Sequence, residues 1–210
     1  MYHALLSNHR ARTRKVICRA AVEALEVRRL FATIVVTSAA DDLTPNDGTV
    51  SLREAIQAIN NGSAGADTDI SNQSPGTFGV NDTINFNISA SGAVQTIQVG
   101  STGLGELPSQ IVPITINGYS ETGASMNTLA NADNAKVLIE LDGANAGANA
   151  DGILIGPGGA GSTIEGLAIN RFSLNGIEAQ GGCTIQGNFV GTNPTATAAE
   201  PNQNDGISSS

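Results

Sequence analysis

The side chains in this sequence that could perform acid–base or metal chemistry are mainly carboxylates. Hydrolysis of a glycosidic bond needs two carboxylates facing one groove, and a polysaccharide lyase needs acidic ligands for Ca²⁺ with an arginine or lysine as base. The candidates for these roles are Asp142, Asp151 and Arg171, with Glu165 as a further oxygen donor. An outward acid is more often a solvated surface group, and Arg171 is expected at the surface or beside an aspartate. These residue types therefore favour a protein without a catalytic site.

Histidine and cysteine add no catalytic or metal centre to these carboxylates. His3 and His9 lie near the start, so the acidic part of the chain has no imidazole base. Cys18 lies in the basic N-terminal stretch, which leaves Cys183 without a disulfide partner. Cys183 precedes a strand-like Thr-Ile pair and suits a buried small residue better than a nucleophile.

Two stretches resemble Ca²⁺-binding loops without meeting their requirements. Segment 158–163, GGAGST, has Thr163 where the Gly-rich calcium repeat carries its aspartate, so it predicts a turn. In segment 42–48, Asp47 stands where a helix-flanked calcium loop needs glycine. We expect no cofactor, and a weak Ca²⁺ site at 42–48 is the alternative left open.

Charge divides the chain into two parts. Residues 1–32 hold seven basic and two acidic residues, a net charge of +5, whereas residues 33–210 hold three basic and 17 acidic residues, a net charge of −14. An acidic body repels phosphate backbones, so we expect no nucleic-acid partner. No run approaches the roughly 18 apolar residues of a membrane-spanning helix.

The acidic part opens with a strand and a short helix. The β-branched run at 33–37 predicts a strand, and an acidic turn follows from Asp41 to Gly48. Ser51 and Glu54 have the spacing of a capping box at the start of a helix that we expect to reach about residue 60. Its apolar face is made by Leu52, Ile56 and Ile59, together with Ala55.

From residue 80 a strand-and-turn pattern recurs. Thr-Ile followed by a polar residue begins at positions 83, 96, 115, 163 and 184, and Gly-Ile pairs begin at 152, 176 and 206. Units of roughly 20–30 residues are typical of a solenoid, in which stacking covers apolar sides that one unit cannot cover alone. The fold class expected is all-β: a right-handed parallel β-helix with isoleucines stacked in register. An antiparallel β-sandwich is the alternative, and segment 192–203 is expected to be a projecting loop.

Several segments resemble known families. Residues 25–32, LEVRRLFA, resemble the motif that closes the export segment of planctomycete extracellular proteins, through Leu25, Glu26, Arg28 and Leu30. Residues 47–56, DGTVSLREAI, resemble the CSLREA domain of secreted β-helix proteins, although Val50 stands where that family usually has cysteine. Residues 114–119, 138–143 and 187–192 resemble the first coils of the same proteins. The resemblance implies the fold and export, and it implies no particular reaction.

These observations divide the chain into three regions. Residues 1–32 are a basic export segment, and residues 33–79 contain a strand, a helix and a loop. Residues 80–210 are β-helix coils that we expect to be truncated at the C-terminus. The open end of a β-helix exposes apolar residues and unpaired strand edges, so we expect Leu52, Ile56 and Ile59 to cover the N-terminal end.

The expected function is that of an exported, non-catalytic module of a cell-surface, adhesive or structural protein, located outside the cell or on its surface. Its partners would be cell-surface polysaccharide or further repeats of a longer parent protein. The alternative is a polysaccharide lyase or glycoside hydrolase of the pectin-lyase-like β-helix type, or a fragment of one. A third possibility is a truncated reading frame with no independent function.

Overall fold

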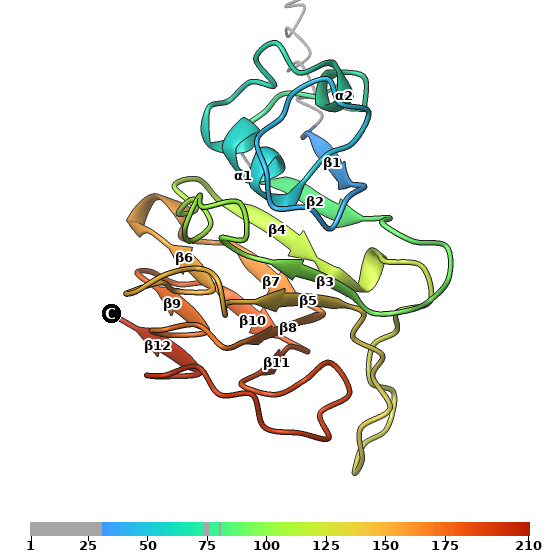
Figure 1. Cartoon of the computed structure of the whole chain (residues 1–210), viewed down its shortest axis with the longest axis vertical. Coiled ribbons are helices and arrows are strands. Elements are labelled where there is room, and N and C mark those ends of the chain that lie inside the picture. The colour runs from blue at the N-terminus through green and yellow to red at the C-terminus, as the bar shows by residue number, and fades with distance from the viewer. Residues whose placement is uncertain (1–30, 74–75, 80) are drawn as a thin grey trace, which may run out of the picture.

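The computed structural model describes residues 31–73, 76–79 and 81–210. The export-motif residues Leu25, Glu26, Arg28 and Leu30, and also Cys18, lie outside these ranges. In the described part, the chain is mostly β-structure in parallel sheets, with few helices. The strands follow one another along the long axis of the molecule, with α1 and α2 at one end and β11 and β12 at the other (Figure 1).

The largest sheet described has five strands in the order β1-β2-β4-β7-β10. Their bounds are β1 Thr33–Val36, β2 Asp82–Phe86, β4 Ile114–Asn117, β7 Thr163–Glu165 and β10 Thr184–Gln186. Each is paired in parallel with its neighbour. The register aligns one isoleucine from every strand, in the order Ile34, Ile84, Ile116, Ile164 and Ile185.

Two further sheets complete the described stack. One has the order β11-β8-β5-β3 and consists of β3 Gln95–Gln98, β5 Ile139–Asp142, β8 Leu167–Asn170 and β11 Phe189–Val190. The other has the order β12-β9-β6 and consists of β6 Ile153–Ile155, β9 Ile177–Ala179 and β12 Ile207–Ser209. Their strands are also paired in parallel, and the three Gly-Ile pairs align at Ile153, Ile177 and Ile207.

The chain visits the three sheets in rotation. After β4, β5 and β6 it returns to the first sheet with β7 and repeats the circuit twice. Before β4, Gln110 takes the place of a strand in the third sheet through a parallel bridge to Ile155. The predicted parallel direction is therefore confirmed among the described strands, and the antiparallel sandwich is wrong. One Thr-Ile pair was grouped wrongly with the others, because Ile97 lies in the second sheet beside Leu141.

Apolar burial runs along the inside of all three sheets. Ile84, Ile116 and Ile164 are fully buried in the first sheet, and Ile153 and Ile177 are fully buried in the third. Burial of one such side chain contributes about 1.5–3 kcal/mol relative to exposure. Because each inward residue rests on its counterparts in neighbouring strands, the core extends along the stack.

Side chains of the Asp/Asn type link successive strands at one corner. The residue before each Gly-Ile pair is Asp151, Asn175 or Asp205. The Asn175 backbone N–H donates to Asp151 Oδ1 at 2.9 Å, and the Asp205 N–H donates to Asn175 Oδ1 at 3.1 Å. Each side chain thus satisfies a corner N–H that no strand partner reaches.

Helix α1, Leu52–Asn60, packs against β1 and β2 at one end of the stack. The capping box is present: Ser51 Oγ accepts from the Glu54 N–H at 3.1 Å, and Glu54 Oε2 accepts from the Ser51 N–H at 2.9 Å. Leu52, Ile56 and Ile59 are buried on its inner face.

A second helix, α2 Thr68–Ser71, had no clear signal in the sequence. It has a single turn, with Asp67 as its N-cap.

Two segments leave the strands and return. Segment 121–138 follows the 3-10 helix η1, Gly118–Ser120, and projects beside the stack, closed by an antiparallel bridge between Ser125 and Lys136 (Figure 1). Segment 191–203 follows β11 and is closed by a bridge between Thr192 and Ala199, where a loop was expected. The Gly-rich stretch after β6 forms the 3-10 helix η2, Pro157–Gly159, and a turn.

Candidate functional site

A pocket of about 370 Å³ lies between the projecting segment 121–138 and the polar ends of three strands. We call it the Tyr119 pocket. The projecting segment contributes Met126, Asn127, Asp133 and Ala135, and η1 contributes Tyr119. The opposite wall is formed by Glu165 at the end of β7, by residues 186–188 and by Phe189 in β11. Two of the few aromatic side chains in the chain, Tyr119 and Phe189, therefore line this pocket.

The ring of Tyr119 rests on two glycine corners of the stack. A Cβ atom at Gly166 would lie 2.8 Å from the ring, and one at Gly187 would lie 2.5 Å from the hydroxyl. Both glycines have positive φ angles, of 72° and 61°, which other residues adopt only with strain. The Tyr119 hydroxyl also donates to the Gly187 carbonyl at 2.7 Å. The glycines after the Thr-Ile units thus turn the chain and also provide the surface on which the ring lies.

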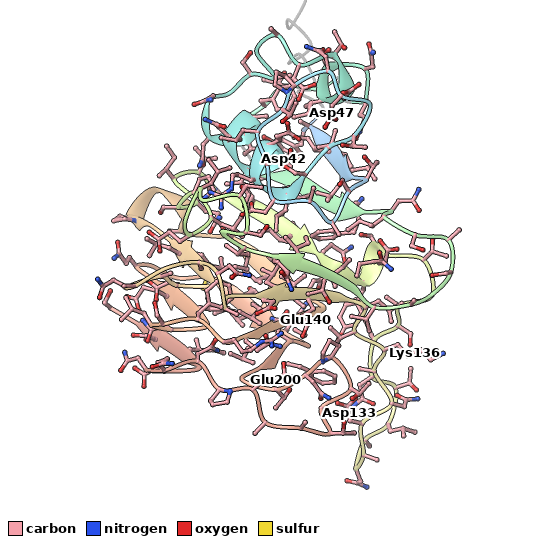
Figure 2. The ribbon with its side chains drawn as sticks, viewed as in Figure 1. Asp42, Asp47, Asp133, Lys136, Glu140 and Glu200 are labelled. Atoms are coloured by element: carbon pink, nitrogen blue, oxygen red, sulfur yellow. The ribbon has the colours of Figure 1, made fainter. Side chains whose placement is uncertain are left out.

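The electrostatic character of the Tyr119 pocket is negative. Asp133 and Glu165 line it, and no basic residue is among the described residues of its wall. The pKa of the Tyr119 hydroxyl is raised, first by burial and then by the negative charges of Asp133 and Glu165. Figure 2 shows Asp133 on the projecting segment, far from Asp42 and Asp47 at the end that carries α1.

Local hydrogen bonds hold the projecting segment in shape. Asn134 Oδ1 accepts from the Thr128 N–H at 2.8 Å, and Asn127 Oδ1 accepts from the Leu129 N–H at 2.9 Å. Asn127 Nδ2 donates to the Ala132 carbonyl at 2.9 Å. These side-chain bonds replace strand pairing in this part of the segment, which places Asp133 on the pocket wall.

The structure brings together two of the three predicted catalytic candidates. Arg171 Nη2 donates to Asp142 Oδ2 at 2.7 Å, and Arg171 Nε lies 3.9 Å from Glu200 Oε2. Asp142 is buried, and its other oxygen accepts from the Ala144 N–H. Arg171 is therefore an aspartate partner, which was one of the two expectations for it, and its ion pairs tie segment 191–203 to the second sheet.

Glu140 extends this polar cluster, although the sequence did not single it out. Its two oxygens accept from Thr96 Oγ1 at 2.6 Å and from Asn170 Nδ2 at 2.9 Å. Asn170 also donates to the Thr192 carbonyl at 3.0 Å. Figure 2 shows Glu200, on segment 191–203, below Glu140 on β5. The sequence did contain a signal for this cluster. Residues two apart in a strand face the same side of the sheet, and Glu140 precedes Asp142 by two residues.

Asp151 has different contacts from Asp142 and Arg171. Its carboxylate accepts from the Asn175 N–H at the corner described above, and its own N–H donates to Glu106 Oε2 at 3.1 Å. Asp151 is therefore a buried residue that stabilises this corner through backbone hydrogen bonds.

An ion pair that the sequence did not predict joins α1 to segment 99–107. Arg53 Nε and Nη2 donate to the two oxygens of Asp41 at 2.7 and 2.9 Å, and both residues are buried. Arg53 also donates to the carbonyls of Gly105 and Glu106, each at 2.7 Å. The sequence placed Asp41 at the start of an acidic turn and did not indicate its burial: its carboxylate also accepts from the Gly100 N–H at 2.6 Å.

A second cavity, of about 290 Å³, lies beside α1 and is lined in part by Leu43, Pro45, Glu54, Asp67 and Ile70. Burial raises the pKa of Glu54 to about 6, and the hydrogen bonds from Ser51 only partly offset this. Glu54 Oε1 is buried without a hydrogen-bond partner among the described residues. The ionised form of Glu54 therefore lowers the stability of the fold.

Segment 42–48 and Cys183 have ordinary structural surroundings in the described part of the chain. Among the described residues, no group of three or more His, Cys, Asp or Glu side chains could hold a metal ion. In segment 42–48, Asp42 accepts from the Thr44 N–H and Asp47 from the Thr49 N–H, as in ordinary turns. Cys183 is a free thiol that is half-buried rather than fully buried, and burial raises its pKa.

Comparison with known proteins gave no match to this chain among protein-family models, curated proteins or solved structures. The helices in the described ranges are all too short or too polar to cross a membrane.

Proposed function

We propose that this chain is an exported, non-catalytic β-helix module of a cell-surface, adhesive or structural protein, and that it contacts carbohydrate through the Tyr119 pocket. The observation that carries the proposal is the composition of that pocket. It combines the Tyr119 and Phe189 side chains with amides and carboxylates from the projecting segment and from the strand ends opposite it. Aromatic rings offer flat apolar surfaces, and amides and carboxylates offer hydrogen bonds, which together suit a sugar ring.

The parallel sheets support a right-handed parallel β-helix as the architecture. The chain passes through the three sheets in the same order in each turn, and each strand lies in register on its counterpart in the preceding turn. Connections between parallel strands of one sheet are right-handed in nearly all proteins. Helix α1, with its buried inner face against β1 and β2, then caps the first coil and covers its apolar end.

The proposed location rests on the likeness of residues 25–32 to an export motif and on the strongly acidic body that follows. Mass spectrometry of the protein recovered from a secreting host tests this part. A mature N-terminus close to residue 33, with the protein outside the cytoplasm, is the expected result. An intact N-terminus in a cytoplasmic protein would contradict export.

The alternative of a polysaccharide lyase or hydrolase is favoured by one observation, the contact between Asp142 and Arg171. Against it, Asp142 is buried and engaged at both oxygens, and the neighbouring Glu140 is engaged as well. Incubation of the protein with acidic polysaccharides, with and without Ca²⁺, separates the two functions. Cleavage that disappears in Asp142→Ala or Arg171→Ala would replace the binding function with the enzymatic one.

Carbohydrate binding itself is tested by affinity electrophoresis in gels that contain soluble polysaccharides. We expect retardation of the wild-type protein that is lost in Tyr119→Ala and in Phe189→Ala. Ile111→Ala is the control, because Ile111 is 54% exposed, does not line the pocket and remains in the protein after cleavage near residue 33. Retardation by no polysaccharide, or equal retardation of all four proteins, would contradict the proposed site.

A further inference from the structure

We infer that the Tyr119 pocket selects sugars that carry a protonated amine, such as the units of a deacetylated glucosamine polymer, and discriminates against uronates. This inference rests on the proposed function and specifies its ligand class. Four features of the pocket support it: its charge, the free oxygens of its carboxylates, the position of its aromatic ring and the field of the surrounding chain.

The charge of the pocket wall has one sign. The wall contains two carboxylates, Asp133 and Glu165, and its described residues include no lysine, arginine or histidine to neutralise them. Neither carboxylate takes part in an ion pair among the described residues. A uronate entering this pocket would bring like charges together, which is unfavourable, whereas an ammonium group would be attracted.

Each carboxylate is oriented by one hydrogen bond and keeps one oxygen for a ligand. Glu165 Oε2 accepts from Gln186 Nε2 at 2.8 Å, and Asp133 Oδ1 accepts from the Ala135 N–H at 2.8 Å. The other oxygen of each group has no hydrogen-bond partner among the described residues. An ammonium group has three donors, so it can bind such oxygens while a neighbouring hydroxyl contacts the amides.

The aromatic ring adds a second interaction for a cation. One side of the Tyr119 ring rests on Gly166 and Gly187, so the ring is fixed in place while the residue also lines the pocket. A cation over the face of a tyrosine is attracted by the ring, and carboxylates beside the ring increase the attraction. Neutral sugars gain the apolar contact with the ring but not this charge interaction.

The field of the whole chain acts in the same direction. Residues 33–210 carry a net charge of −14, so an acidic polymer is repelled before it reaches the pocket. Glu165 and Gln186 are register partners on adjacent strands, so successive units of an extended chain can contact them in turn. This arrangement favours a linear amino-sugar polymer over a small cation.

The test is calorimetric titration of the full chain with four oligosaccharides of equal length: glucosamine, N-acetylglucosamine, glucose and galacturonate oligomers. We expect the glucosamine oligomer to bind most tightly, with an affinity that falls as salt is added. Glu165→Gln and Asp133→Asn should each weaken it about two- to fivefold, and Tyr119→Ala about tenfold. Asp42→Asn removes the same charge at the opposite end of the molecule and should leave the affinity unchanged.

The outcomes separate this inference from the proposed function. Tightest binding of the glucosamine oligomer, sensitive to Glu165→Gln and insensitive to Asp42→Asn, supports both. Equal or tighter binding of the glucose or galacturonate oligomer, still lost in Tyr119→Ala, overturns the amino-sugar inference and leaves carbohydrate binding intact. Binding of no oligomer overturns both. Tighter binding of a trilysine peptide than of the glucosamine oligomer would assign the pocket to a cationic peptide and overturn the inference.

Discussion

A buried ion pair and a buried unpaired carboxylate near α1 have opposite consequences for stability. Arg53 and Asp41 are paired and fully hydrogen-bonded, whereas Glu54 is buried with one oxygen unpartnered. Burial of a charge is costly unless hydrogen bonds and an opposite charge offset it. The pair therefore holds α1 to segment 99–107, and the ionised form of Glu54 weakens the same region.

The raised pKa of Glu54 predicts a pH-dependent stability. The folded state binds the Glu54 proton with a pKa of about 6, above the ordinary value of 4.5, so the free energy of unfolding falls as pH rises between these values. Glu54→Gln keeps an acceptor for the Ser51 N–H without a charge, so it should exceed the wild type by about 1–2 kcal/mol at pH 8 and match it at pH 4.

Urea unfolding at the two pH values measures this effect. Gln57→Gly serves as the control, because Gln57 is an uncharged, exposed residue of α1, and glycine in a helix should lower stability by about 0.5–1 kcal/mol at both pH values. A Glu54→Gln protein that is less stable than the wild type at pH 8 would show that the ionised carboxylate stabilises the fold.

The Arg53–Asp41 pair predicts a large effect from a single truncation. Arg53→Ala leaves Asp41 buried without its partner and removes two hydrogen bonds to carbonyls, so stability should fall by about 3–5 kcal/mol. Arg171→Ala is the comparison, because the Arg171 side chain is 44% exposed, and it should cost about 1 kcal/mol. Similar midpoints in chemical denaturation for the two variants would refute the distinction between them.

At the scale of single elements, the glycine corners predict a local test of the Tyr119 pocket. Gly187→Ala places a side chain at a φ of 61° and against the Tyr119 hydroxyl, so it should cost about 1–3 kcal/mol and displace the ring. Gly182→Ala, in the preceding connection between β9 and β10, is the control, because a Cβ there would meet no atom within 4 Å.

Thermal unfolding and ligand titration of the two alanine variants measure both effects. Gly187→Ala should lose oligosaccharide binding together with stability, whereas Gly182→Ala should keep both. Normal binding by Gly187→Ala would show that the pocket does not depend on the seating of Tyr119.

The elements that the sequence predicted are those with short-range or periodic signals. Ser51 and Glu54 are three residues apart, so their capping box is visible in the sequence. The recurring Thr-Ile and Gly-Ile pairs likewise indicate parallel strands from the sequence alone. Ile97 was grouped wrongly because a Thr-Ile pair looks the same in every sheet, and only the lengths of the intervening segments decide which sheet it joins.

The candidate site depended on contacts that no local pattern encodes. Tyr119 meets Gly187 across 68 residues, and Arg53 meets the Gly105 carbonyl across 52. Segment 121–138 shows no periodicity, so neither its path nor the position of Asp133 could be predicted. The predicted catalytic candidates were chosen by residue type, which does not distinguish a carboxylate in an ion pair, such as Asp142, from one lining a pocket.

For the molecule as a whole, the stacked arrangement predicts that isoleucines with strands on both sides are more sensitive to truncation than isoleucines of the last described strand. Ile164 is fully buried between strands on both sides, whereas Ile207 in the last described strand is 50% exposed. Ile164→Ala should therefore cost about 2–5 kcal/mol, and Ile207→Ala within about 0.5 kcal/mol. Denaturant titrations measure both, and equal costs would contradict a core formed by stacking.

The most direct test of the stacked architecture is whether the isoleucines of the first sheet contact one another in register. Methyl–methyl NOE spectra of protein labelled at isoleucine, assigned by single Ile→Val variants, report these contacts. The register of the first sheet predicts a continuous series of NOEs from Ile34 to Ile84, Ile116, Ile164 and Ile185. Absence of the Ile84–Ile116 and Ile116–Ile164 NOEs in a folded protein would contradict the stacked coils and, with them, the proposed β-helix and its pocket.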